Sequence, residues 1–393
     1  MSTVSPGSTA VEPFRIAVAD ALLDDLKARL ANTRWPEAEP VADWSQGIPL
    51  AYTQELCRYW AQEYDWRKRE AALNRFDQFR TSLDGGQPAD ALGIHFIHVR
   101  SPHEGALPLV LTHGWPGSVV EFHKVIEPLA EPTRFGGDAA DAFHVVCPAL
   151  PGYGFSDKPS ATGWGVDRIA AAWAQLMDRL GYARYGAQGG DWGSAVTTAI
   201  GRDDPEHCVG IHLNMAAAGR DRSIPEEEYT QAERDALTAA KYYQDWDSGY
   251  SKEQSTRPQT VGYGLVDSPA AQAAWIVEKF WAWMDCGGHP ENVLTRDELL
   301  DNVMLYWATA SGASSARLYW ESFRAFGDRR QITVPTGVAA FPKEILKTSR
   351  RWAARRYTDI RRWTEMPKGG HFAAFEQPEL FVDDVRAFFR LVR

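Results

Sequence analysis

The chain has 393 residues, of which 44% are hydrophobic, 24% charged and 12% aromatic. This composition is typical of a globular protein, and it excludes a disordered chain, a small disulfide-stapled scaffold and a fibrous repeat. The net charge is −10. Because a protein that binds a phosphate backbone usually carries the opposite balance, no nucleic-acid partner is expected.

The cysteine pattern and the apolar runs indicate the compartment. The four cysteines lie far apart and form no CxxC pair, which argues against a zinc site and a disulfide framework. Residues 1–13 lack the basic and apolar regions of a signal peptide, and no run of about 18 apolar residues exists to span a membrane. We therefore expect a cytoplasmic protein with no metal and no membrane contact. The sequence does not determine the oligomeric state, and a homodimer is the working expectation.

Residues 1–92 are expected to form a helical N-terminal extension. Leucines at helical spacing predict a helix over 20–30 with Asp20 as its candidate cap. Trp35-Pro36 ends this helix. A second amphipathic stretch runs from about Leu50 to Phe79, and this block carries no strand pattern.

After Gly85-Gly86 the pattern changes to short apolar runs that alternate with helix patterns. This alternation is typical of a parallel α/β sheet. Strands are predicted at 94–99, 107–112, 142–147, 183–188 and 209–214, and helices at 166–180 and from the turn at 189–193 to about 200.

The alternation stops after residue 215. Residues 216–330 are predicted to be mainly helical, with breaks at glycine and proline. Strand patterns return at 334–341 and near 358–363, and a helix over 378–391 ends the chain. The simplest fold is one α/β sheet built from residues 93–215 and 331–393, with residues 216–330 inserted as a helical cap.

The turn Gly189-Gly190-Asp191-Trp192-Gly193 lies between a predicted strand and a predicted helix. Functional residues of open parallel sheets gather at the carboxyl ends of the strands. Small residues around one polar residue at such a turn indicate a nucleophile elbow, in which serine is usual and Asp191 stands here. The chain has no GxSxG segment that could serve instead. The alternative is that Asp191 only caps the following helix.

A second turn, His113-Gly114-Trp115-Pro116-Gly117, follows another strand. Beside an elbow, such a loop supplies one oxyanion donor and the amide after the nucleophile supplies the other. This predicts the backbone amides of Trp115 and Trp192 as donors. The alternative is an ordinary strand-to-loop turn. The sequence leaves the isomer of the Trp115–Pro116 bond open.

Late in the chain, His371 follows two glycines just before the last helix, where a catalytic base belongs when the elbow lies upstream. Three acids are candidates to orient this histidine: Glu344, Asp359 and Glu365. Glu344 is preferred because it follows directly after a strand. Glu365 lies only six positions before His371.

Six stretches together resemble one family. They are HGWPGS (113–118), PALPGYGFSD (148–157), GGDWG (189–193), NVMLYW (302–307), VPTGVAAFPKE (334–344) and GGHFAAFE (369–376). The chain resembles the microsomal-type epoxide hydrolases, a branch of the α/β-hydrolase superfamily, from about Phe14 to its end. Microsomal members begin with a membrane-anchoring helix. This chain begins directly at the extension, so it is similar to the soluble bacterial members.

The resemblance implies a role for each matching residue. Asp191 would be the nucleophile, His371 the base that activates water, and Glu344 the acid that orients it. Tyr250 and Tyr319 match the two cap tyrosines that bind the epoxide oxygen, with Tyr242, Tyr243 and Tyr263 as rivals for the first of these roles. The substrate is expected to contact Trp115, Trp192 and Phe155.

The implied activity converts a small-molecule epoxide and water to a vicinal diol without a cofactor. A carboxylate at the elbow suits this chemistry, because attack by serine would leave an ether, whereas Asp191 would leave an ester that water can cleave. The expected substrate is a bulky or aromatic epoxide, either a xenobiotic or a secondary-metabolite intermediate. The alternatives are a haloalkane dehalogenase-like hydrolase and a non-catalytic binding protein on the same fold.

Overall fold

The structure is a computed structural model that describes residues 9–323 and 325–393. Residues 1–8, part of the segment where no signal peptide is expected, lie outside these ranges. Within them, nine strands form one mixed sheet in the order β1-β2-β3-β5-β4-β6-β7-β8-β9. The strands are β1 (Glu12–Phe14), β2 (Gln78–Leu83), β3 (Leu92–Val99), β4 (Leu107–Thr112), β5 (Phe143–Pro148), β6 (Tyr185–Gly189), β7 (Cys208–Leu213), β8 (Thr336–Ala340) and β9 (Ile360–Glu365).

The strands from β5 to β9 pair in parallel, whereas β1, β2 and β3 add to the sheet in antiparallel pairs. The central strand β4 is a run of apolar residues, and Leu109, Val110 and Leu111 are fully buried. Such a strand is stable only where both faces are covered. Because β4, β6 and β8 are parallel, the turns that follow them meet at one edge of the sheet.

Helices cover the sheet and its carboxyl edge. They are α1 (Asp20–Ala31), α2 (Leu50–Gln62), α3 (Trp66–Leu73), α4 (Ile126–Ala130), α5 (Val166–Arg179), α6 (Asp191–Asp203), α7 (Gln231–Tyr242), α8 (Gly249–Thr256), α9 (Pro258–Asp267), α10 (Pro269–Trp283), α11 (Arg296–Ala308), α12 (Gly312–Glu321), α13 (Arg350–Ala353), α14 (Ala373–Glu376) and α15 (Pro378–Phe389). Short 3-10 helices occur at Pro88–Asp90, Val119–Phe122, Pro132–Phe135, Ala139–Asp141, Glu226–Glu228, Pro290–Asn292 and Ala325–Gly327, and a π-helical turn at Tyr243–Asp247. None of the helices in the described ranges is long and apolar enough to cross a membrane.

Two expectations for the extension are wrong. The stretch from Leu50 to Phe79 divides into α2, α3 and the start of β2, and β1 also lies in the block where only helices were expected. β1 is the edge strand and pairs with β2, which pairs in turn with β3. Backbone pairing with these distant partners decides the structure here, and hydrophobic periodicity carries little information. Asp20 does not cap α1. The cap is Ala19, and the Asp20 carboxylate pairs with Arg67.

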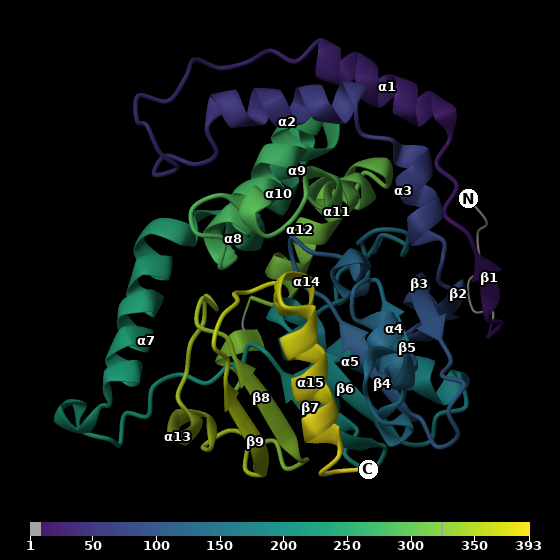
Figure 1. Ribbon diagram of the computed structural model, residues 1–393, viewed down its shortest axis with the longest axis vertical. Helices are drawn as coiled ribbons and strands as arrows, with labels where there is room; N and C mark the ends of the chain where they lie inside the picture. Colours follow the sequence, from purple (N-terminus) through teal and green to yellow (C-terminus); the bar gives the residue numbers. More distant parts are fainter. Residues whose placement is uncertain (1–8, 324) are drawn as a thin grey trace.

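The extension fastens the cap. In Figure 1, α1 and α2 lie across the group formed by α8 to α12, above the sheet. Arg69 Nε donates to Asp301 Oδ1 over 2.8 Å, and the Tyr59 hydroxyl donates to Asp297 Oδ1 over 2.8 Å. Both acids lie on α11. The extension therefore holds a cap helix that, as described below, contacts the HGWPG loop.

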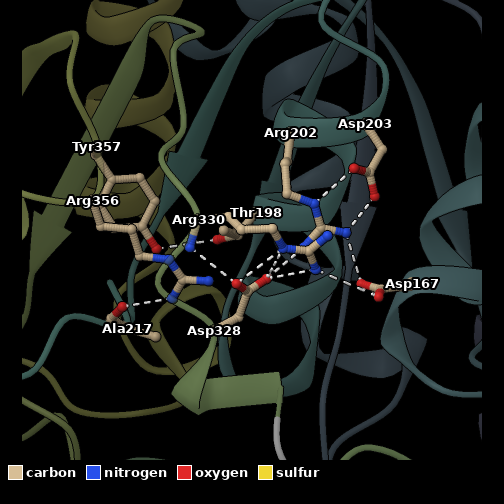
Figure 2. Close-up of polar contacts among 9 residues, drawn as sticks. All are labelled: Asp167, Thr198, Arg202, Asp203, Ala217, Asp328, Arg330, Arg356 and Tyr357. Atoms are coloured by element: carbon tan, nitrogen blue, oxygen red, sulfur yellow. Dashed lines mark hydrogen bonds and ion pairs between the residues drawn. The ribbon is translucent and has the colours of Figure 1, made fainter.

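A polar cluster holds the other end of the elbow helix α6. Figure 2 shows its members, which are Asp167, Thr198, Arg202, Asp203, Ala217, Asp328, Arg330, Arg356 and Tyr357. Arg202, on α6, is 2.8 Å from Asp167 Oδ1 on α5 and 2.7 Å from Asp328 Oδ2, in the segment that returns from the cap to β8. These contacts join α6 to α5 and to the segment that leads into β8.

Candidate active site

Asp191 occupies a sharp turn between β6 and α6. Its φ of 50° lies in the left-handed region, which side chains other than glycine rarely adopt and which often marks a functional site. The flanking glycines are required sterically. A Cβ on Gly189 would lie 2.1 Å from the Gly193 carbonyl oxygen, and a Cβ on Gly193 would lie 1.8 Å from the Thr112 carbonyl oxygen. The Asp191 carboxylate does not cap α6, for which Gly190 is the cap residue.

The Asp191 carboxylate instead faces the HGWPG loop and His371. The Trp115 backbone N–H donates to Asp191 Oδ1 over 2.8 Å, and Asp191 Oδ2 lies 3.4 Å from His371 Nε2. The second predicted donor, the Trp192 N–H, belongs to the first turn of α6, where amides point out of the helix N-terminus. Both predicted backbone donors thus lie at the nucleophile turn.

His371 is oriented by Glu344. Nδ1 of the buried imidazole lies 2.7 Å from Glu344 Oε1, and the Lys343 N–H donates to the Gly369 carbonyl, which aligns the two loops. Burial alone would lower the pKa of His371. The charge of Glu344 and the hydrogen bonds to both carboxylates outweigh this and raise that pKa well above its ordinary value. The imidazolium is therefore favoured while Asp191 is ionised.

The two rival acids lie in other surroundings. Asp359 accepts from Arg361 Nε over 3.0 Å, and Glu365 accepts from the Trp363 indole over 3.2 Å. Neither forms the contact with His371 that Glu344 forms. The structure thus pairs the histidine with the acid that directly follows the β8 strand.

The HGWPG loop is held by the cap. The Trp115–Pro116 bond is cis. Asn302 Nδ2 donates to the Pro116 carbonyl over 2.8 Å, and the Tyr306 hydroxyl donates to the Gly117 carbonyl over 2.7 Å. Both side chains come from the NVMLYW motif on α11, which the extension fastens. The sequence revealed this motif but not its contact with the loop.

The two predicted cap tyrosines meet above this loop. Tyr250, on α8, stacks on Trp115 with ring centroids 4.9 Å apart, and Tyr319, on α12, lies edge-on to Trp192 at 4.8 Å. Their rings are 5.7 Å apart. The Tyr319 hydroxyl proton has no acceptor among the described residues. Burial raises the pKa of each of these two phenols well above its ordinary value, so both are present as proton donors.

The rival tyrosines separate by position. Tyr242 and Tyr263 are 63% and 71% exposed, so neither side chain belongs to the buried site. Tyr243 does belong to it, because its hydroxyl lies 2.8 Å from that of Tyr250. Burial raises the pKa of Tyr243 to about 12. The structure therefore presents a pair of linked phenols where the sequence suggested one or the other.

Two further residues at His371 were not found by sequence reasoning. The Trp283 carbonyl accepts from the His371 N–H over 3.0 Å, and its ring lies 5.1 Å from the imidazole. The Glu376 carboxylate accepts from the backbone amides of Phe372 and Gly370 over 2.9 and 3.0 Å. Glu376 is the last residue of the GGHFAAFE motif, so the sequence pointed to this residue but not to its hydrogen bonds with the backbone around His371.

Phe155 lies elsewhere than expected. Its ring packs against Phe14 at 5.4 Å and His95 at 5.7 Å, between the extension and β3. Of the other two expected substrate contacts, Trp115 lines the cavity beside Asp191, and Trp192 follows Asp191 on α6 and packs against Tyr319. In the described part of the chain, no group of three or more histidine, cysteine or acidic residues could hold a metal ion.

Comparisons with known proteins identify the family. Residues 11–122 match the family described as "Epoxide hydrolase N terminus", and residues 108–264 match "alpha/beta hydrolase fold". The chain is 53% identical to a protein of Stigmatella aurantiaca over 98% of this chain and 86% of that protein. It is 36% identical to epoxide hydrolase 1 of Sus scrofa over 98% of this chain and 89% of the relative.

A solved structure agrees over nearly the whole chain. The crystal structure of juvenile hormone epoxide hydrolase from the silkworm Bombyx mori has a TM-score of 0.89 and 33% identity, covering 98% of this chain and 95% of that one. The fold and the arrangement at the elbow define an α/β hydrolase. Within that fold, the chain belongs to the epoxide hydrolase family.

Proposed function

We propose that this protein hydrolyses an epoxide to a vicinal diol through a covalent ester on Asp191. The observation that carries the proposal is the placement of two phenols opposite a nucleophilic carboxylate. Tyr250 and Tyr319 both pack on the Trp115 ring, at 4.9 and 5.8 Å, and the Trp115 amide holds Asp191. One side of the site can attack carbon while the other receives the oxygen that leaves.

In the first step, an Asp191 oxygen attacks one epoxide carbon and forms a carbon–oxygen bond. The opposite carbon–oxygen bond of the ring breaks, and its electron pair goes to the departing oxygen. Tyr250 and Tyr319 donate hydrogen bonds to this oxygen, and one of them gives up its proton. Preorganised donors aimed at a developing charge are among the strongest contributions to catalysis.

In the second step, water cleaves the ester. Once Asp191 is esterified its negative charge is gone, so the pKa of His371 falls, the imidazolium releases its proton to solvent and the neutral imidazole becomes available as a base. His371 Nε2 takes one proton from water while the water oxygen attacks the Asp191 carbonyl carbon, and the backbone amides of Trp115 and Trp192 stabilise the oxyanion. The ester bond then breaks, and His371 passes its proton to the oxygen that departs from the Asp191 carbonyl carbon, which releases the diol. The proton left on the Asp191 carboxyl then restores the tyrosine. His371 takes a proton back from solvent when the Asp191 carboxylate is restored.

A haloalkane dehalogenase-like reaction is the second candidate, because it also uses a carboxylate at the elbow. A departing halide needs N–H donors and no pair of phenols. The ring of the cap residue Trp283 lies 5.1 Å from the imidazole of His371, and its indole N–H already donates to Asp247 over 2.6 Å. The linked phenols therefore favour an oxygen leaving group.

The substrate proposed is a bulky or aromatic epoxide. Aromatic side chains surround the nucleophile on the cap and core sides, namely Trp115, Trp192, Trp283, Tyr250 and Tyr319. Such rings offer large apolar area and favour edge-on or stacked contacts with another ring.

The proposal is tested by trapping the ester. His371→Ala protein is incubated with styrene oxide or with 1-chlorohexane, digested, and analysed by mass spectrometry for the peptide that carries Asp191. A mass gain equal to the whole epoxide supports the proposal. Alkylation by the chloroalkane alone supports the dehalogenase reaction. Absence of any adduct, with no diol from wild-type protein but retained epoxide binding, indicates a non-catalytic binding protein.

A further inference from the structure

A second carboxyl group lies beside the nucleophile. Glu121 follows the HGWPG loop on the 3-10 helix Val119–Phe122. A Cβ on Gly117 would lie 1.5 Å from Glu121 Oε1, just as a Cβ on Gly114 would lie 2.2 Å from Asp191 Oδ1. The two glycines of the loop are therefore each covered by a carboxyl group. Any larger residue at 117 would occupy the space that Glu121 fills.

Glu121, His371 and Asp191 line one small cavity, together with the loop at Trp115. This cavity has a volume of about 20 Å³, which is enough for one water molecule and too small for a substrate. A buried water is stable where it has two to four polar partners. The side chains of Glu121, His371 and Asp191 supply these partners. Asp191 carries the carboxyl group that becomes the ester.

We propose that Glu121 is a positioning residue that holds the hydrolytic water between its carboxyl group and His371. The inference rests on the proposed ester mechanism and adds the group that locates the water. The water donates one O–H to His371 Nε2, which removes that proton, and the other O–H to Glu121. Its lone pair is then left to attack the Asp191 carbonyl carbon.

The charges around Glu121 couple its role to the second step. Burial is the main reason why the pKa of Glu121 is raised to about 8, and the charges of Asp191 and Glu376 raise this pKa further. The charge of His371 and a hydrogen bond with the Ser118 backbone act in the opposite direction. Formation of the ester removes the Asp191 charge. Loss of the His371 proton in the same intermediate removes the imidazolium charge, so these two changes act on the pKa of Glu121 in opposite directions. The carboxylate form of Glu121 is the stronger acceptor for the water.

The test separates the two chemical steps. Wild-type protein, Glu121→Gln and the control Glu127→Gln are mixed with styrene oxide in a quenched-flow instrument, and the ester on Asp191 is quantified by mass spectrometry. Glu127, on the neighbouring helix α4, forms an ion pair with Arg75 at 3.9 Å, and both side chains are at least 40% exposed. We expect Glu121→Gln to form the ester within threefold of the wild-type rate and to hydrolyse it at least tenfold more slowly, so that the ester accumulates. Glu127→Gln should resemble the wild type in both steps.

If Glu121 had only a structural role, its replacement would slow both ester formation and ester hydrolysis, or neither of them. The pH profile provides a second readout, because ester hydrolysis in the wild type should depend on Glu121 as well as His371, whereas Glu121→Gln should keep only the His371 limb. Should Glu121→Gln fail to fold, a crystal structure of wild-type protein decides the question. A water within about 3 Å of both Glu121 and His371 supports the inference, and its absence overturns it.

The outcomes distinguish this inference from the function on which it rests. If Glu121→Gln forms the ester and hydrolyses it at the wild-type rate, the positioning role is wrong and the ester mechanism stands. If no ester appears on Asp191 in any variant, His371→Ala included, the proposed function itself fails.

Discussion

Replacing Glu344 by glutamine isolates the contribution of one buried charge to the second step. Glu344 Oε1 lies 2.7 Å from His371 Nδ1, and its charge is the main reason why the pKa of the imidazole is raised. Two unit charges about 4 Å apart attract by about 4 kcal/mol at an effective dielectric constant of about 20. A neutral amide in the same place keeps a hydrogen bond of about 1 kcal/mol. The imidazolium formed during ester hydrolysis therefore loses about 3 kcal/mol, which corresponds to a rate about 150-fold lower.

The first step should be nearly unaffected, because Asp191 attacks the epoxide without proton transfer to His371. Rapid mixing of Glu344→Gln protein with excess styrene oxide should thus give a burst of ester at close to the wild-type rate, followed by slow diol release. Glu365→Gln is the matched control, since Glu365 is exposed and its carboxylate accepts from the Trp363 indole, away from His371. An equal loss in both steps, or wild-type hydrolysis of the ester, would refute the reasoning.

Three further predictions concern the phenols, the elbow and the cap. Tyr243→Phe should slow ester formation about three- to tenfold, because it removes the hydroxyl 2.8 Å from that of Tyr250, whereas the control Tyr242→Phe, at an exposed position, should not. Stopped-flow quenching of tryptophan fluorescence measures ester formation in both variants, and equal rates would contradict a contribution of Tyr243 through Tyr250. Gly193→Ala should lower the free energy of unfolding by at least about 2 kcal/mol in urea titrations, since its Cβ would strike a β4 carbonyl; wild-type stability would contradict this. A hydrogen bond from Arg351 is the main reason why the pKa of Glu233 is lowered from 4.5 to about 2. Glu233 should therefore stabilise the fold above pH 4.5, and this contribution should be lost as the pH falls to about 2. The free energy of unfolding of Glu233→Gln should depend less on pH across this range than that of the wild type.

Much of the site was accessible from the sequence because its parts are local. The elbow at 189–193, the HGWPG turn and the glycine pair before His371 each follow a strand, and each needs particular residues for steric reasons within a few positions. Their order along the chain, together with the alternation of strands and helices, predicted a parallel sheet with its functional residues at one edge. The structure has this parallel arrangement from β5 through β4 to β9, whereas β1, β2 and β3, the last of which was predicted as a strand of the parallel sheet, pair antiparallel.

The sequence was less informative where distant segments decide the outcome. The strand β2 forms because β1 and β3 offer it backbone partners on both sides, so its residues need no strong strand pattern. Phe155 lies in a family motif, yet its ring packs against Phe14 and His95 and not at the nucleophile. The N-terminus of α1 was likewise misjudged, because Asp20 has a better partner in Arg67, some fifty positions away.

The sequence by itself determined the fold class, the sharp turn at Asp191 and the choice of His371 as a candidate beside it, since backbone sterics and strand order restrict these from nearby residues. Only the tertiary structure decided which tyrosines face Asp191, which acid meets His371, and that Glu121 covers Gly117 beside them. The tyrosine contacts join segments far apart along the chain and depend on the way α8 and α12 pack over the sheet, whereas the Glu344–His371 pair depends on how the loops after β8 and β9 meet. Glu121 is close to Gly117 in the sequence, but the fold of the 3-10 helix Val119–Phe122 decides that its carboxyl group turns back over that glycine. Spacing along the sequence carries no record of these arrangements.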